Sequence, residues 1–342
     1  MDNCTKIKRI EWVDRAKSFC MFLVILGHCH IQDSDSFVTQ FIYSFHMMLF
    51  FFLSGLLCKK EFSIETIKRD MQYILLPYFT YGIMYVIFGA VRSHVYQLDK
   101  VVNGVWLLIQ GKDPAIGPFW FLFALFICKQ LFYVVKCLKK RNLYLYYIFV
   151  ALSFFSVYFI TQYQLNLPFF MDSALCGLPF FILGNESFPF FRWIGIINRY
   201  FQLLLVILLL IISVFLSYYN GFVSVADCVI GRSVWIYYLN AIISISLVVT
   251  ICIAFRNYGA FVRVTSYGSV VTLGLHSYFL IFFNFYLGRL LRFEFVSYSI
   301  FIALIFSFFT YIGCFLIIIF LDRCCPKPFG LRGNFCECIL NQ

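Results

Sequence analysis

Charged residues are scarce in this chain. They make up 13% of the 342 residues, whereas hydrophobic residues make up 62% and the mean hydropathy is +0.87. No polar stretch is long enough to fold as a separate water-soluble domain, so a pair of soluble domains, which the length alone would suggest, is excluded. The composition indicates a polytopic membrane protein.

Acidic residues are the scarcer of the two charge signs, with 16 Asp and Glu against 27 Lys and Arg. Basic residues beside hydrophobic spans record membrane orientation, so a nucleic-acid partner is excluded despite the net charge of +11. The charged opening is followed by no small-residue cleavage site, so no cleavable signal peptide is expected. Internal repeats are also lacking, which removes support for the inverted repeats of many secondary transporters.

Long apolar runs are what the sequence does have. A bilayer core of about 30 Å needs about 20 apolar residues per helix. The chain therefore predicts an all-α fold, a single membrane domain over residues 1–342 with a short N-terminal segment 1–15 and a tail 322–342. About ten transmembrane helices are expected, at residues 16–31, 41–58, 73–91, 116–135, 143–162, 168–184, 200–219, 233–255, 268–288 and 299–321. The sixth opens with Pro168 and carries Asp172 and Pro179, so a broken or re-entrant helix is an alternative there.

The distribution of Lys and Arg orients these spans. With the N-terminus inside, 20 of the 27 lie in inner segments, six in outer segments, and Lys129 lies within a span. Short cytoplasmic loops collect positive charge. Both termini are therefore expected in the cytoplasm.

The 14 cysteines lie mostly inside the predicted helices or on the cytoplasmic side, where thiols stay reduced, so no structural disulfides are expected. Four of them cluster in the tail: Cys324, Cys325, Cys336 and Cys338. Their spacing fits no standard zinc-ligand pattern, so free thiols are favoured over a metal site.

Ionisable side chains inside hydrocarbon cost at least a few kcal/mol each, so they are the first candidates for function. Those within the predicted spans are Lys17, His28, His30, His46, Lys129, Asp172 and His276. For any one of them the alternative is a structural hydrogen bond between helices or an interfacial position.

Lys17 and His28 are eleven residues apart, which is almost three turns of an α-helix, so they share one face and lie about 16 Å apart. This spacing predicts a polar stripe from the cytoplasmic boundary to a buried imidazole. His30 is turned about 200° away, which favours an interfacial position. In the second span His46 lies near the depth of His28. Ser54 and Gly55 near its inner end form a small-residue notch that admits either a neighbouring helix or a ligand.

These residues belong to motifs that resemble the membrane-bound acyltransferase family 3. The run EWVDRAKSFCMFLVILGHCH, from Glu11 to His30, resembles the family's opening, with its basic residue and His at Lys17 and His28. FHMMLFFFLSGLL, from Phe45 to Leu57, resembles its second helix, with Met48 where Pro is usual. Weaker matches in the family's order are LLPY (75–78), PFWFLFALF (118–126), LPFFILG (178–184) and LGLHSYFL (273–280). The closest subgroup is that of the fucose 4-O-acetylase-like sugar O-acetyltransferases.

The resemblance implies transfer of an acetyl or other short acyl group from cytoplasmic acyl-CoA to a sugar hydroxyl of a cell-surface polysaccharide or its precursor, at the inner membrane and without a bound cofactor. His28 is then the expected general base. His46 either orients His28, binds the acceptor or only packs. Asp14, Trp120 and His276 are expected to be structural or substrate-binding.

The donor site is expected at Lys17, Lys68, Arg69 and Ser54, because the phosphates of CoA need cationic partners reachable from the cytoplasm. The alternative for Lys68 and Arg69 is a role as positive-inside anchors. The family often has two Arg one turn apart before its third helix, whereas this chain has Lys68 and Arg69 followed by Met71 and Gln72.

Two other function classes compete with the enzyme. A transporter or flippase for lipid-linked sugar would also need about ten helices, buried polar groups and many aromatic residues. A non-catalytic scaffold is less favoured, because it gains nothing from a His deep in hydrocarbon.

Overall fold

The structure, a computed structural model, describes residues 9–29, 36–92, 98–111, 114–165, 167–256, 258–283 and 300–340. Within those residues it contains helices and no strand, apart from one isolated antiparallel bridge between Ser224 and Val229. The predicted all-α fold is therefore confirmed. His30 lies outside the described residues.

The chain divides into two compact units. The first comprises Met1–His46, Pro189–Tyr219 and Leu239–Gln342, and the second comprises Met47–Phe188 and Asn220–Tyr238. The prediction of one membrane domain over residues 1–342 stays a prediction.

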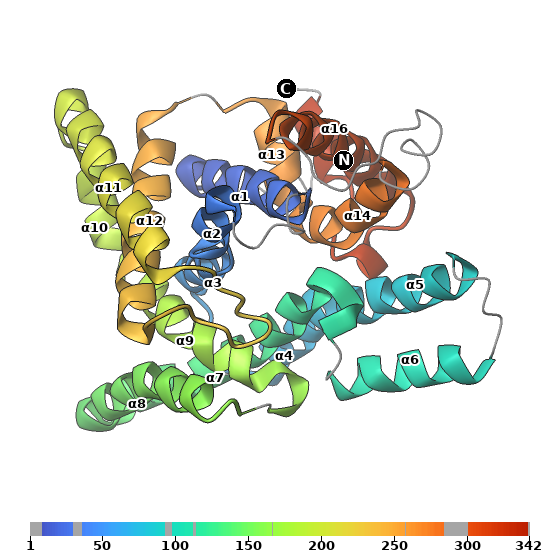
Figure 1. Ribbon diagram of the computed structural model, residues 1–342, viewed down its shortest axis with the longest axis horizontal. Helices are drawn as coiled ribbons and strands as arrows, with labels where there is room; N and C mark the ends of the chain where they lie inside the picture. Colours follow the sequence, from blue (N-terminus) through green and yellow to red (C-terminus); the bar gives the residue numbers. More distant parts are fainter. Residues whose placement is uncertain are drawn as a thin grey trace. The chain divides into compact units, whose positions relative to one another are not determined.

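The first unit is a bundle in which α1 packs against α13, α14 and α16 (Figure 1). Its helices are α1 (Glu11–Cys29), α2 (Phe37–Tyr43), α10 (Phe188–Ile194), α11 (Arg199–Asn220), α12 (Val234–Ala254), α13 (Ala260–Tyr267), α14 (Ser269–Ile281), α16 (Ile300–Cys324), η5 (Lys327–Phe329) and α17 (Phe335–Leu340); one end of α10, α11 and α12 falls in the second unit. The Ser18 hydroxyl fixes α1 in this bundle, at 2.8 Å from the hydroxyls of both Thr265 and Tyr311.

The tail after α16 is a folded part of the first unit. Asp322 accepts hydrogen bonds from the Tyr267 hydroxyl at 2.7 Å and from the backbone N–H of Cys336 at 2.8 Å. Cys336 is buried in a small apolar cluster with Ile318 and Leu331, while Cys324 and Cys325 are exposed. Within the described chain no group of three or more His, Cys, Asp or Glu side chains is placed to hold a metal ion.

The second unit packs α7, α8 and α9 against one another and lays α5 alongside α6 (Figure 1). Its helices are α3 (His46–Leu57), α4 (Ile64–Asp70), the π-helical turn η1 (Met71–Leu75), α5 (Leu76–Arg92), α6 (Leu98–Gln110), η2 (Pro114–Phe119), α7 (Trp120–Arg141), α8 (Leu143–Gln162), η3 (Pro168–Phe170) and α9 (Met171–Glu186); the first residue of α3, His46, belongs to the first unit.

Helices α3 and α9 touch backbone to backbone. A Cβ placed on Gly55 would lie 1.9 Å from the carbonyl oxygen of Phe181, and one on Gly184 would lie 2.0 Å from that of Phe52. Only glycine at both positions allows this approach. The close approach of a neighbouring helix that the Ser54–Gly55 pair predicts therefore occurs, and the neighbour at Gly55 is α9.

The described residues contain seven helices that are long and apolar enough to cross a membrane, or eight if a bent pair counts as one span. The seven are Phe37–Leu57, Ile64–Arg92, Gly117–Arg141, Leu143–Gln162, Arg199–Asn220, Val234–Ala254 and Ile300–Cys324. The predicted number of ten is not confirmed. Helix α1 fails the test because Glu11, Asp14, Arg15 and Lys17 fill its first two turns, and α14 has only 13 residues.

The bent pair, helix Pro168–Glu186 and helix Phe188–Ile194, includes the sixth predicted span. Its break lies at Ser187, beyond the predicted end of that span at residue 184, and α9 continues through Pro179. A break therefore occurs next to this span, but not inside it as the sequence allowed.

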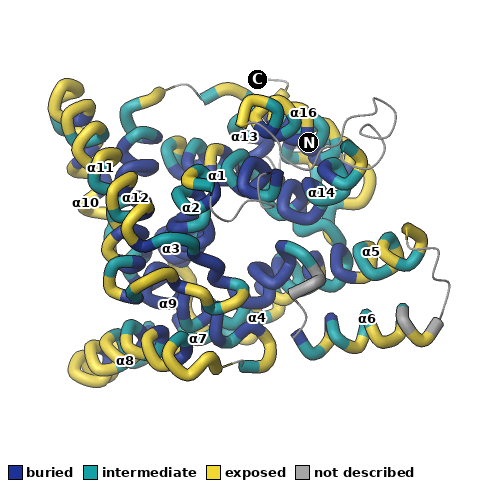
Figure 2. The backbone as a smooth tube through the Cα atoms, viewed as in Figure 1, coloured by how far each residue is buried: buried dark blue, intermediate teal, exposed yellow. Residues whose placement is uncertain are grey.

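Two helices expose apolar side chains over most of their surface, as Figure 2 shows for α8 and α11. Only 17% of the most apolar window of α11 is buried, although its mean hydropathy is 2.6, and α8 is 22% buried. A helix that is apolar all round and exposed is stable only against lipid. These two surfaces place the chain in a membrane.

Candidate active site

His28 is the second-last residue of α1, and its ring is oriented by its own helix. Its Nδ1 is 2.8 Å from the backbone carbonyl oxygen of Val24. A carbonyl oxygen only accepts hydrogen bonds, so Nδ1 carries the proton, and in the neutral ring Nε2 keeps its lone pair. The side chain is half-buried. This geometry leaves Nε2 as the basic atom.

His276 contacts His28 directly, although the two residues are far apart in sequence. The two ring centroids are 4.8 Å apart, and the planes are nearly perpendicular at 75°. His276 is fully buried, and its Nδ1 is 3.0 Å from the carbonyl oxygens of both Thr272 and Leu273. Its Nε2 is buried with no hydrogen-bond partner in the described structure.

The motif match assigned His276 a structural or substrate-binding role, but nothing in the sequence paired it with His28. The packing of α14 on α1 brings the two together. No local spacing signals this contact, because the two side chains belong to separate helices. The pair of imidazoles is therefore a product of the tertiary fold.

His46 is buried at the start of α3, and its ring, like that of His28, is oriented by a hydrogen bond to the carbonyl oxygen four residues earlier. Its Nδ1 is 2.8 Å from the carbonyl oxygen of Ile42. The ring of Tyr43 lies beside it, with centroids 4.9 Å apart, and is 6.4 Å from the ring of His28. Tyr43 thus lies next to both imidazoles.

Tyr43 is a residue that the sequence reasoning missed. It approaches α1 closely because position 27 is glycine, where an added Cβ would lie 3.0 Å from Tyr43 Cε2. The sequence feature that could have indicated Tyr43 is its position three residues before His46, at the outer end of the second predicted span. The group formed by His28, His276, Tyr43 and His46 is called the histidine cluster below.

Lys17 lies on α1 with His28, and the helix is continuous between them, so the predicted shared face holds. Its side chain is half-buried. Asp14, one turn earlier, accepts hydrogen bonds from Arg9 at 2.6 and 2.7 Å, from Ser266 at 2.7 Å and from the hydroxyl of Tyr258. These contacts tie the start of α1 to α13 and favour the structural role for Asp14.

The pKa of Asp14 reflects this environment. Burial acts to raise it, but the hydrogen bonds and positive charge of Arg9, with the hydrogen bonds from Tyr258 and Ser266, hold the pKa of Asp14 below its usual value. Burial and the neighbouring carboxylate raise the pKa of Tyr258 to about 12. Asp14 is therefore an anion paired with Arg9 at neutral pH.

The remaining predicted site residues belong to the second unit. Lys68 is exposed and Arg69 half-buried at the end of α4, just before the π-helical turn η1. Ser54 is half-buried on α3. Trp120 begins α7 and is buried, with its ring 6.1 Å from that of Phe121.

A buried ion pair lies beside Arg69 and was also missed. Asp70 accepts hydrogen bonds from Lys129 at 2.6 Å and from the Tyr133 hydroxyl at 2.8 Å, and the Arg69 guanidinium is 3.7 Å away. Lys129, which the sequence placed inside a span, is therefore neutralised by a carboxylate on another helix. In the sequence, Asp70 directly follows the basic pair Lys68 and Arg69. Its partner Lys129 is 59 residues away in the chain, so sequence spacing does not reveal the ion pair.

One comparison with known proteins gives a match. A family profile described as an acyltransferase domain matches residues 10–319, which is most of the chain and includes the histidine cluster, Lys68 and Arg69. Searches of curated proteins and of solved structures give no match.

Proposed function

Because the chain belongs to the acyltransferase family 3 and is a membrane acyltransferase, we propose that it transfers an acyl group, by default acetyl, from cytoplasmic acyl-CoA to a sugar hydroxyl. The acceptor is a cell-surface polysaccharide or its precursor. Within the family we place the chain with the fucose 4-O-acetylase-like sugar O-acetyltransferases, on the motifs at Glu11–His30 and Phe45–Leu57. The transporter alternative is not favoured, because the family is one of acyltransferases.

The observation that carries the proposal is the orientation of His28. Its Nδ1–H donates to Val24, so Nε2 is available to take a proton near neutral pH. A sugar hydroxyl that loses its proton to Nε2 attacks the thioester carbonyl carbon, and a C–O bond forms. The C–S bond then breaks, and the CoA thiolate takes the proton back from the imidazolium. The products are an ester and CoA, with no acyl-enzyme needed.

The other members of the cluster support this chemistry. The edge-on contact with His276 and the nearby ring of Tyr43 restrict the His28 ring, which keeps Nε2 in one direction. His46, whose ring lies 4.9 Å from that of Tyr43, is the proposed contact for the acceptor.

The donor contacts belong to this proposal as well. CoA carries several phosphate charges, and Lys17, Lys68 and Arg69 are cationic residues at the predicted cytoplasmic boundary. Lys17 shares a helix face with His28, about 16 Å away at 1.5 Å per residue, which suits a donor whose thioester lies far from its phosphates. We place the protein in the inner membrane with both termini in the cytoplasm, as the distribution of Lys and Arg favours.

The test is single-turnover transfer from labelled acetyl-CoA to methyl glycosides by the full chain in lipid nanodiscs. His28→Ala should lose about 10²-fold or more of the transfer rate, the scale of a positioned acid–base group. The matched control is Phe19→Ala on the same helix, because Phe19 is 42% exposed and lies about 180° from His28 around the helix axis.

Near-normal transfer by a well-inserted His28→Ala protein would refute the assignment of the base and would direct attention to His46 or His276. A loss of equal size in Phe19→Ala would instead mean that α1 tolerates no truncation. In that case the loss in His28→Ala would carry no chemical meaning.

A further inference from the structure

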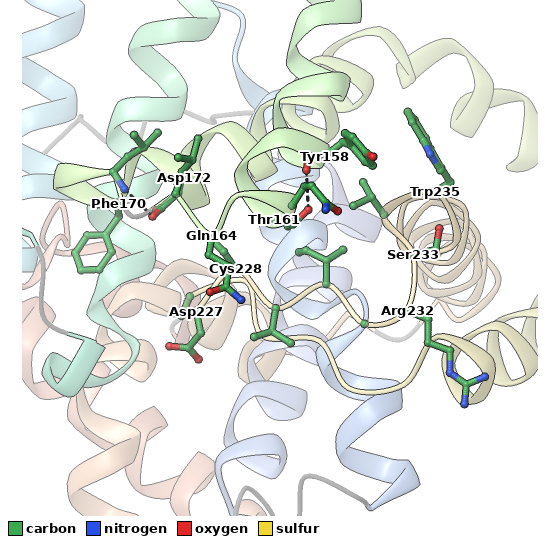
Figure 3. Close-up of a pocket in the computed structure, with 18 of the residues that line it drawn as sticks. Tyr158, Thr161, Gln164, Phe170, Asp172, Asp227, Cys228, Arg232, Ser233 and Trp235 are labelled. Carbon is green, nitrogen blue, oxygen red and sulfur yellow. Dashed lines mark hydrogen bonds between the residues drawn. The ribbon is translucent and has the colours of Figure 1, made fainter.

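The second unit contains a cavity of about 700 Å³, and no residue of the histidine cluster lines it. Its walls are the end of α8, the segment that leads into α9, the loop 221–233 and the first turn of α12 (Figure 3). This volume lies within the usual range for small-molecule sites. All lining residues belong to the second unit.

The loop 221–233, which forms one wall of this cavity, is held in shape by hydrogen bonds. Ser224 and Val229 exchange two backbone hydrogen bonds at 2.7 and 2.9 Å. The Asn220 side chain donates to the carbonyl of Ile230 at 2.9 Å, and Ser173 of α9 donates to that of Val225 at 3.1 Å. A loop with this many internal bonds holds one shape, as compact functional loops do.

Backbone strain is concentrated around the same cavity. Five non-glycine residues in the described chain have a positive φ, and three of them line the cavity: Gln164 (47°), Phe170 (52°) and Cys228 (55°). Gly231 (φ 77°) also lines it, and a Cβ there would lie 2.4 Å from the Asn220 carbonyl oxygen. Such conformations cost free energy and cluster at binding sites, because the surrounding structure must hold them.

The lining combines aromatic faces with hydrogen-bonding groups (Figure 3). Tyr158 on α8 and Trp235 on α12 supply the aromatic faces. Trp235 is 50% exposed, and the ring of Phe155 lies against its ring at a centroid distance of 5.6 Å. A rigid, half-exposed indole offers an apolar plane to a ligand.

The polar groups of the lining are amides, hydroxyls and carboxylates. They are Thr161, Gln162, Gln164, Asp172, Asp227 and Ser233, together with the guanidinium of Arg232. Asp172 is fixed, because its oxygens accept from the backbone N–H of Leu167 at 3.3 Å and of Ser173 at 2.7 Å. Two carboxylates with one guanidinium do not suit the phosphates of CoA.

A neutral pyranose fits this lining. Its C–H face packs on an aromatic ring, and its hydroxyl groups both donate to carboxylates and accept from amides. On the predicted topology the end of α8 and the start of α12 lie on the outer side of the membrane, where cell-surface glycans are.

We propose that the cavity lined by Tyr158, Gln162, Asp172 and Trp235 binds a pyranose unit of the glycan acceptor. This inference rests on the proposed function for the identity of the glycan as acceptor. Binding of the sugar itself is independent of transfer.

The experiment uses the full chain in nanodiscs and three neutral probes: methyl α-L-fucopyranoside, methyl β-D-galactopyranoside and methyl α-D-mannopyranoside. Binding is measured by saturation-transfer NMR without acetyl-CoA. Trp235→Ala and Gln162→Ala should weaken binding, by about tenfold or more for the indole, which supplies the anchoring face. Trp193→Ala is the matched control, because Trp193 is 57% exposed in the first unit and should leave binding unchanged.

A second measurement needs no substitution. Cys228 lines the cavity and is partly exposed, so its labelling by a maleimide, mapped by mass spectrometry in the wild-type protein, should slow when the glycoside is present. This readout holds even if Trp235→Ala fails to fold.

Three results would overturn the inference: none of the glycosides binds, a glycoside that binds leaves Cys228 labelling unchanged, or its affinity is the same for Trp235→Ala and wild type. The last result would assign Trp235 to the aromatic belt at the membrane surface. Failure of the proposed function looks different. In that case transfer is absent or independent of His28, while Trp235-dependent sugar binding persists and still supports the cavity.

Discussion

Replacing Gly55 by alanine should destabilise the contact between α3 and α9 more than any ordinary Gly→Ala change in a helix. The added Cβ would lie 1.9, 2.7 and 2.9 Å from the O, C and Cα atoms of Phe181. These are backbone atoms of a helix, so no side-chain rotation relieves the overlap. Ordinary contact begins at 3.4 Å, so the two helices must separate by about 1.5 Å at this crossing.

The magnitude follows from three contributions. Overpacking a tight core costs about 1–3 kcal/mol. Separation also stretches the two hydrogen bonds that the Asn185 amide donates to the carbonyls of Gly55 and Cys58, both at 3.0 Å, each worth about 1 kcal/mol. The gain in helix propensity returns about 0.5–1 kcal/mol. The net loss is about 2–4.5 kcal/mol.

The assay is thermal unfolding in a mild detergent, and the fraction unfolded at each temperature is measured by thiol labelling of the buried cysteines. Gly89→Ala on α5 is the control, because a Cβ there has no atom within 4 Å, so this change should stabilise by about 0.5–1 kcal/mol. A Gly55→Ala protein as stable as wild type, or two variants that shift equally, would refute the close packing of α3 on α9.

Two further predictions concern the charged groups. Lys17→Ala and Arg69→Ala should raise the KM for acyl-CoA in a salt-sensitive way and leave acceptor KM unchanged; unchanged donor KM with intact insertion would make both residues membrane anchors. The pKa of Asp14 is held below its usual value, so its pairing with Arg9 contributes its full stability above a pH of about 4, the ordinary carboxyl pKa. This stability is lost as the pH falls through the lowered pKa of Asp14. Unfolding curves of Asp14→Asn and wild type should therefore differ at pH 7 and converge in acid, and a constant difference would contradict this.

The sequence by itself determined the fold class, most of the membrane spans and the family. Apolar runs about 20 residues long have few physical alternatives to a transmembrane helix, because a bilayer leaves no water for unpaired backbone groups. The prolines suggested a break in the sixth span, but α9 continues through Pro179 and the break lies at Ser187, so its position was not readable from the sequence. The shared face of Lys17 and His28 followed from helix periodicity, which is a property of one continuous segment.

Only the tertiary structure decided which groups from different helices meet. The contact of His276 with His28, the position of Tyr43 beside both His28 and His46, and the pairing of Lys129 with Asp70 all join segments that are remote in sequence. In an apolar chain the spacing along one helix states which face a residue occupies, but it does not state which helix covers that face. That choice depends on packing, such as the approach of α9 to Gly55, and packing is a property of two surfaces together.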